Sequence, residues 1–182
     1  MLLTIQTLDS APADSRPIME AIAADLGLVP NLAATAATSP ALLAGFDGLR
    51  RAVASTKLDP VLREVTGLAV GVAVDNRYGV AFHSTMLANL GLDEADIDAL
   101  RKGHAPSDDA AAAAHRLARE VVLGRGKVSD ATITQATEAG FDLEAILEIV
   151  LESTFASLVG TIDNLANHVE LDDFLSPRAW EG

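Results

Sequence analysis

Cysteine is absent from this 182-residue sequence, and its absence sets the first limit on function. Without a thiol the chain has no thiolate nucleophile and forms no disulfide, so every thiol-dependent reaction is excluded. A chain without cysteine also says nothing about the redox state of its compartment.

Basic and aromatic residues are scarce as well. Lys and Arg number 13 against 26 Asp and Glu, which gives a formal net charge of -13. Because nucleic acids and anionic membranes attract cationic surfaces, we expect neither as a partner. Aromatic residues make up 4% of a chain that is 49% hydrophobic, so we expect a core of small side chains and closely spaced helices.

Uninterrupted apolar runs are short as well. The run from Val65 to Val74 is shorter than the ~20 residues that a membrane-spanning helix needs. The opening MLLTIQTLDSAPADS has no basic n-region of a secretory signal. We therefore expect a cytoplasmic protein. The length fits one domain, residues 1–182, with an N-terminal arm (1–13) and an acidic C-terminal tail (169–182).

The pattern that is present is helical. Strand-like alternation of apolar and polar residues is not sustained anywhere, so we expect an all-α fold. Asp59, Asp75, Asp93 and Ser129 are the N-caps that we expect for four of the helices. The expected helices cover residues 16–26, 29–38, 40–55, 61–74, 76–90, 94–102, 107–123, 130–139 and 143–168.

The segment from Glu64 to His83 is the most informative stretch. The short break near residue 75 predicts that the two helices beside it fold back as a hairpin. Asn76, Gly79 and His83 share one face of the second helix, since they lie at i, i+3 and i+7. Glu64 reaches that face if the hairpin closes suitably, and a carboxylate then meets an imidazole among apolar side chains.

This spacing resembles a known active-site pattern. In the AhpD-like alkylhydroperoxidases of the carboxymuconolactone decarboxylase superfamily, a glutamate is followed by cysteines twelve and fifteen residues later and by a histidine nineteen residues later. Glu64 and His83 match that pattern, whereas Asn76 and Gly79 occupy the cysteine positions. The resemblance covers most of the chain, because it extends to Tyr78, Val80, Ala81, Val29-Pro30-Asn31-Leu32, Ser39-Pro40 and Gly91-Leu92-Asp93-Glu94.

The resemblance implies an AhpD-like helical bundle with a central helical hairpin, assembled as a homo-oligomer, often a trimer or a hexamer. Thiol peroxidase activity is excluded, because it needs a thiolate and a resolving cysteine. The decarboxylase branch, whose chemistry is independent of thiols, implies a small carbonyl or lactone acid as substrate and no cofactor. No HxxxH or HExxH spacing occurs, so we expect no metal site.

Each residue of the candidate site has two interpretations. His83 is either a proton shuttle oriented by Glu64 or a core histidine bonded to a carbonyl. Asn76 is either a helix cap or a hydrogen-bond donor to substrate. Tyr78 either lines the pocket or packs in the core. Gly79 either lets a neighbouring helix cross closely or enlarges a substrate pocket over His83.

Two functions remain open. The first is a cofactor-independent lyase or isomerase that uses His83 and Glu64 for acid–base chemistry, decarboxylation or isomerisation, on a small carbonyl or lactone acid. The second is a noncatalytic homo-oligomer that binds a small molecule, or has a structural role, and keeps only a remnant of the pocket.

Overall fold

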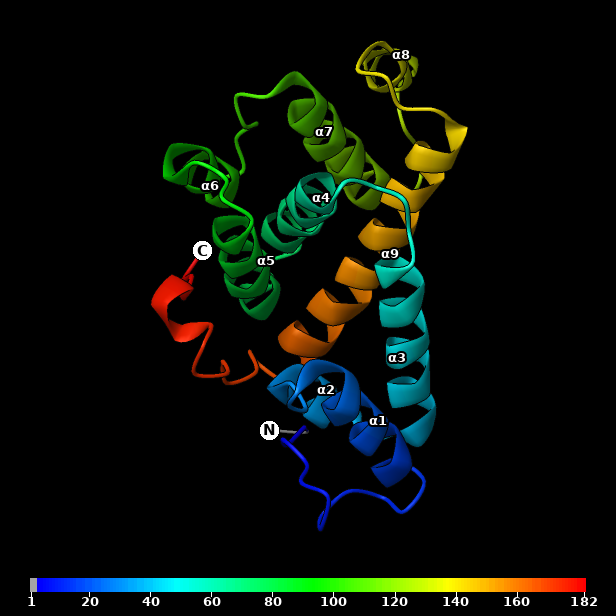
Figure 1. The fold of residues 1–182 in the computed structure, drawn as a ribbon, viewed down its shortest axis with the longest axis vertical. Coiled ribbons are helices and arrows are strands. Elements are labelled where there is room, and N and C mark those ends of the chain that lie inside the picture. Colours follow the sequence, from blue (N-terminus) through cyan, green and yellow to red (C-terminus); the bar gives the residue numbers. More distant parts are fainter. Residues whose placement is uncertain (1–2) are drawn as a thin grey trace.

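The computed structural model describes residues 3–182, which form helices and, within that range, no strand (Figure 1). The first two residues of the predicted N-terminal arm lie outside the described residues. The predicted all-α fold is confirmed. The elements are α1 (Arg16–Leu26), α2 (Asn31–Ala36), α3 (Pro40–Ala54), α4 (Pro60–Ala73), α5 (Arg77–Asn89), α6 (Glu94–Arg101), α7 (Asp109–Leu123), α8 (Asp130–Glu138), α9 (Leu143–Leu165) and the 3-10 helix η1 (Ser176–Arg178).

Helices α4 and α9 form the centre of the molecule. The hairpin partners α4 and α5 pack against each other and both contact α9, while α7 packs against α4 and α9 (Figure 1). At one end α1, α2 and α3 form a second layer against α9, and at the other end α6 and α8 flank this core. The predicted helical hairpin therefore lies at the centre of the fold.

Small side chains make this close packing possible. Ala33, Ala69, Ala114 and Ala118 are completely buried, each in one of the clusters that make up the core. Gly160 on α9 has the same effect, because a Cβ atom there would collide with Val74 at the hairpin turn. The low aromatic content thus corresponds to helices that approach each other closely.

The hairpin turn differs from the expectation in one residue. The sequence predicts Asp75 as the cap of α5, but Asp75 adopts the left-handed conformation with φ 54°. Asn76 is the N-cap instead, and its Oδ1 accepts a hydrogen bond from the Gly79 N–H at 2.8 Å. The cap interpretation of Asn76 is therefore confirmed. The left-handed turn at Asp75 comes one residue before this cap.

Other helix ends also differ from the expectation: α2 covers Asn31–Ala36 where residues 29–38 are expected, and the ends of α7 and α9 have a visible cause. Helix α7 begins at Asp109 with Asp108 as its cap, because the expected starting residue Ser107 bonds through its N–H and hydroxyl to Asp96. Helix α9 ends at Leu165, short of the expected end at residue 168, and the chain then turns through Asn167 and His168 in left-handed conformations.

The C-terminal tail packs against the body of the protein. Leu175 is completely buried, and the Trp180 indole N–H donates to the Arg101 carbonyl at 3.2 Å. Helix α9 is also long and apolar enough to cross a membrane, but core helices of soluble proteins pass the same test. In this fold α9 packs against α3, α4, α5 and α7.

Candidate active site

The structure brings Glu64 and His83 into direct contact. Glu64 lies on α4 and His83 on α5, and closure of the hairpin places Glu64 Oε2 at 2.8 Å from His83 Nδ1. Glu64 is 7% exposed and the His83 side chain 12%, so the pair is largely shielded from water. At that distance the two groups share a proton in a charge-assisted hydrogen bond.

A glycine on α4 makes room for the imidazole. A Cβ atom on Gly67 would collide with three atoms of the His83 ring. Gly67 lies three residues after Glu64, on the same face of α4, so the ring lies against bare helix backbone beside its carboxylate partner. Sequence reasoning missed this residue, because a glycine inside a helix does not reveal which neighbouring side chain it accommodates.

A second carboxyl group faces the other side of the ring. Glu152 on α9 is 3% exposed, and its Oε1 lies 4.0 Å from His83 Nε2. That distance is too long for a hydrogen bond. Sequence reasoning missed Glu152 too, although a signal was present: it falls between Ile149 and Phe155 on the apolar stripe of α9, where an acid is unusual.

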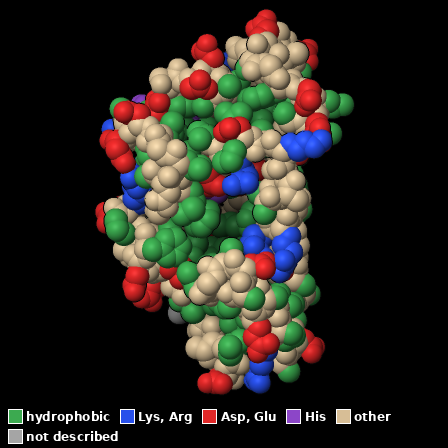
Figure 2. Space-filling model, viewed as in Figure 1, with side chains coloured by type: hydrophobic (Ala, Val, Ile, Leu, Met, Phe, Trp, Pro, Cys, Tyr) green, Lys and Arg blue, Asp and Glu red, His purple; other side chains and the backbone are tan. Residues whose placement is uncertain are grey.

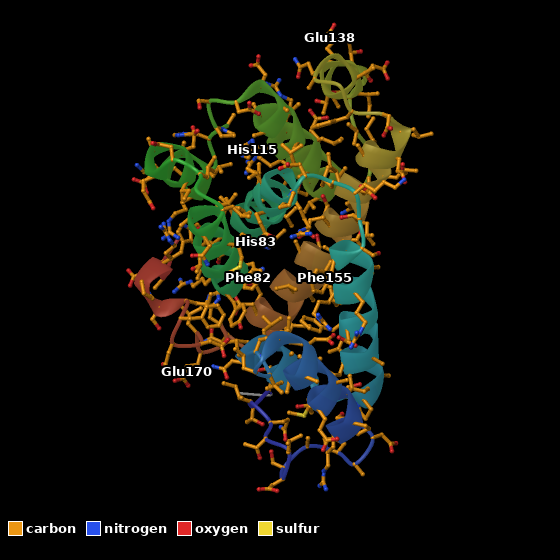
Figure 3. All side chains as sticks on the ribbon, viewed as in Figure 1. Phe82, His83, His115, Glu138, Phe155 and Glu170 are labelled. Carbon is orange, nitrogen blue, oxygen red and sulfur yellow. The ribbon has the colours of Figure 1, made fainter. Side chains whose placement is uncertain are left out.

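These three residues border a cavity of about 490 Å³. Figure 2 shows the corresponding face, where hydrophobic side chains surround a hollow that has charged groups at its margin. Phe82 from α5 and Phe155 from α9 lie on either side of the space next to His83 (Figure 3). A narrower pocket of about 100 Å³ adjoins it, also lined by Phe82, His83 and Phe155. The volume of the larger cavity suits a small ligand.

The surroundings shift the pKa values of the two carboxyl groups in opposite directions. Burial raises the pKa of Glu64, but its hydrogen bond to His83 and the His83 and Arg63 charges outweigh burial and lower the pKa below its usual value. Burial raises the pKa of Glu152 to about 7, since no hydrogen bond from residues 3–182 to its carboxylate offsets the cost of burying the charge. The surroundings therefore favour the ionised form of Glu64 and shift Glu152 towards its protonated form.

The pKa of His83 responds to both neighbours. Burial lowers it, while the hydrogen bond and charge of Glu64, and then the charge of Glu152, raise it above its usual value. Arg63 borders the cavity and donates through Nε to Glu64 Oε1 at 3.3 Å. Its terminal nitrogens have no hydrogen-bond partner within residues 3–182 and remain available for an anionic ligand.

The other predicted site residues are placed differently. Tyr78 and Gly79 line the narrower pocket, where the Tyr78 hydroxyl donates to Asp172. Asn76 is 1% exposed, caps α5 and lines neither pocket. A Cβ atom on Gly79 would collide with the Asn76 amide, which accounts for the glycine in part. Among residues 3–182, no three His, Asp or Glu side chains are arranged to hold a metal ion.

The central part of the chain matches a known protein family. Residues 40–120 match the model of the carboxymuconolactone decarboxylase family, and that segment contains the Glu64 and His83 positions. The predicted resemblance to the AhpD-like and carboxymuconolactone decarboxylase superfamily, in a chain without the cysteine pair, is confirmed. No curated protein matches the chain significantly.

Solved structures share the whole fold. An AhpD-core, peroxidase-related protein from Ralstonia eutropha JMP134 has a TM-score of 0.81 at 22% identity, over 94% of this chain and 92% of that one. A peroxidase-related protein from Silicibacter sp. TM1040 has a TM-score of 0.74 at 17% identity, over 95% and 94%. A cysteine-to-alanine variant of the debrominase Bmp8, bound to 2,3,4-tribromopyrrole, has a TM-score of 0.77 at 16% identity, over 98% and 95%. Identities this low show the fold alone.

Proposed function

We propose that this chain, whose residues 40–120 match the carboxymuconolactone decarboxylase family, is a cofactor-independent enzyme that moves a proton on a small carbonyl or lactone acid. The observation that carries the proposal is the 2.8 Å hydrogen bond between Glu64 and His83 at the edge of a cavity. An imidazole bonded to a carboxylate beside a cavity is an arrangement suited to general acid–base catalysis.

The two residues have different roles in this proposal. In this proposal the His83 Nδ1–H donates a hydrogen bond to the Glu64 carboxylate. That bond favours the tautomer in which the Nε2 lone pair is free. Nε2 takes a proton from the substrate or returns one to it. Glu64 stabilises the imidazolium that forms, so His83 is the catalytic residue and Glu64 positions it.

The lining of the cavity suggests the shape of the substrate. Phe82, Phe155 and Met86 supply apolar walls, and Arg63 supplies a positive charge at the side of the reacting groups. A small, largely apolar molecule with one acidic group satisfies both. The debrominase neighbour was solved with a small halogenated heteroaromatic ring, which favours a planar ligand in this fold. Thiol chemistry on any such ligand is excluded here.

The test is a turnover screen of small lactones and keto acids with matched variants. We expect Glu64→Gln to lower kcat by about 10²-fold, since glutamine cannot stabilise an imidazolium, and His83→Gln to lower it by about 10²–10⁴-fold. KM should change less than kcat in both. Glu144→Gln, an exposed position on α9, serves as control. Unchanged kcat in His83→Gln would refute the proposal.

Exposed leucines support a homo-oligomer, which we propose as the assembled state. Leu143 and Leu147 lie one turn apart on α9 and are 70% and 57% exposed. Should the assembled protein bind ligands without turning any over, the noncatalytic small-molecule-binding protein becomes the better description. In that case His83→Gln changes ligand affinity and no reaction rate.

A further inference from the structure

Helix α9 carries two deeply buried acids in different circumstances. Asp163 is completely buried and accepts hydrogen bonds from the Arg77 N–H at 2.9 Å, from the Val169 N–H at 2.7 Å and from His168 at 3.1 Å. Its carboxylate ties the start of α5 to the segment after α9. These contacts account for the acid at that position.

Glu152 has none of these contacts. It is 3% exposed, yet within residues 3–182 no N–H or O–H group donates to its carboxyl oxygens. Burying a carboxyl group without a protein partner costs free energy, so packing alone does not account for an acid at this position. The Glu152 side chain borders the same cavity as His83, so the hydrogen-bond partner of its carboxyl group, water or a ligand, lies in the cavity.

We infer that Glu152 is a second catalytic acid of this site, which donates a hydrogen bond and a proton to the carbonyl oxygen of the substrate while His83 Nε2 takes a proton from the adjacent carbon. This inference rests on the proposed function, since it uses His83 as the base. It makes enolisation of a carbonyl compound, followed by isomerisation, the reaction of the site.

The geometry suits two neighbouring substrate atoms. A carbonyl oxygen and the carbon next to the carbonyl are roughly 2.4 Å apart, as the C=O and C–C bond lengths require. Glu152 Oε1 and His83 Nε2 are 4.0 Å apart, so each can reach one of these two atoms at ordinary contact distance. The two groups contact each other too weakly to bond directly, which leaves both free for the ligand.

Every proton that leaves the substrate or a side chain in this reaction is accepted within the site. Nε2 removes the C–H proton, the C–H electron pair forms the enol double bond, and the carbonyl oxygen takes the proton of Glu152. In a β,γ-unsaturated substrate the imidazolium then returns its proton to the γ-carbon, and the enol O–H returns its proton to the Glu152 carboxylate. The double bond has moved, both residues are restored, and neither water nor a redox partner is consumed.

The protonation state of Glu152 agrees with this role. Burial raises its pKa to about 7, and the Glu64 charge adds to this effect while the charges of His83 and Arg63 oppose it. A carboxylic acid kept neutral by an apolar surrounding is an established way to stabilise an enolate at neutral pH.

The experiment measures proton exchange at carbon. α-Angelica lactone, a β,γ-unsaturated lactone, is incubated with the full-length protein in D₂O, and NMR follows the loss of its α-proton signal. We expect the wild-type protein to exceed the buffer rate, and Glu152→Gln to reduce this excess by at least about 10²-fold, because an amide donates a hydrogen bond but no proton. Glu144→Gln should retain the wild-type rate.

A second readout is independent of the substrate's conversion. In the infrared spectrum at about pH 6, below the raised pKa of Glu152, the wild-type protein should show the carbonyl band of a protonated carboxylic acid, which shifts when a phenol is added as an enolate mimic. Glu152→Gln should lack this band and Glu144→Gln should keep it. A merely structural Glu152 would give no shift with phenol, and that result overturns the inference.

The outcomes separate the two proposals. If His83→Gln abolishes exchange while Glu152→Gln retains it, the proposed function holds and the inference about Glu152 is wrong. If both variants lose exchange and the carbonyl band shifts with phenol, both hold. If the wild-type protein does not exceed the buffer rate, enolisation is wrong for this site and the inference falls with it.

Discussion

At the scale of single residues, Gly67 decides whether His83 can meet Glu64. Gly67→Ala places a methyl group where the imidazole lies, so we expect the ring to leave Glu64 and the free energy of unfolding to fall by about 1–3 kcal/mol. Urea unfolding measures this loss. Gly48→Ala is the matched control, because a Cβ atom there meets open space and should stabilise helix α3 by about 0.5–1 kcal/mol. Equal effects of the two variants would contradict the packing described for Gly67.

Glu152 gives a prediction about pH at the same scale. Its pKa in the folded protein is raised from 4.5 to about 7, so between these values the folded chain holds a proton that the unfolded chain has lost. The stability of the wild-type protein therefore falls as pH rises through this window. Glu152→Gln removes that loss, and its stability relative to wild type should increase by up to roughly 3 kcal/mol between about pH 5 and pH 8. Urea unfolding at both pH values measures the difference; a pH-independent difference would contradict the buried position.

The site could be anticipated from the sequence only where a spacing or a cap revealed it. Glu64 and His83 are predictable because their nineteen-residue separation across a helical break places them on facing sides of a hairpin. Glu152 and Gly67 are not, because their roles depend on which helix face meets His83. That information lies in the packing of α4, α5 and α9, which is set by contacts distant in sequence.

At the scale of elements, the buried acid Asp163 connects α9 to the start of α5. Asp163→Asn keeps the size of the side chain but removes the charge that accepts from the Arg77 and Val169 N–H groups. We expect the free energy of unfolding at pH 7 to fall by about 2–4 kcal/mol. Thermal unfolding of Asp163→Asn and of Glu152→Gln measures this loss. The first variant should be less stable than wild type and the second more stable, although both replace an acid on α9. A loss below about 0.5 kcal/mol would mean that the connection contributes little.

Helix ends are the least predictable part of the elements. Every expected helix is present, because N-caps, prolines and apolar periodicity are local signals. The cap of α5 is displaced by one residue, since Asp75 and Asn76 are both good caps and only the backbone turn distinguishes them. Asp108 replaces Ser107 at the start of α7 for a similar reason, because the Ser107 hydroxyl is taken by Asp96, a residue of the preceding helix.

At the scale of the whole molecule, we expect a homo-oligomer. The chain has a mass of 18.9 kDa, and the resemblance to the AhpD-like proteins favours three or six copies. Sedimentation should therefore give about three or six times the chain mass. The double variant Leu143→Glu with Leu147→Glu should lower that mass, because it places charges on the exposed apolar surface that we propose as the contact between copies. A wild-type protein that sediments as a single chain would contradict the expected assembly.

The central claim is that Glu64 controls the proton on His83, and an NMR titration of the His83 ring in the wild-type protein and in Glu64→Gln tests it most directly. Burial lowers the His83 pKa and Glu64 more than offsets this effect, so the wild-type midpoint should lie above 6.5 and should fall when Glu64 is replaced. The same midpoint in both proteins would mean that the two side chains are not coupled, and the acid–base function proposed for the cavity would then be wrong.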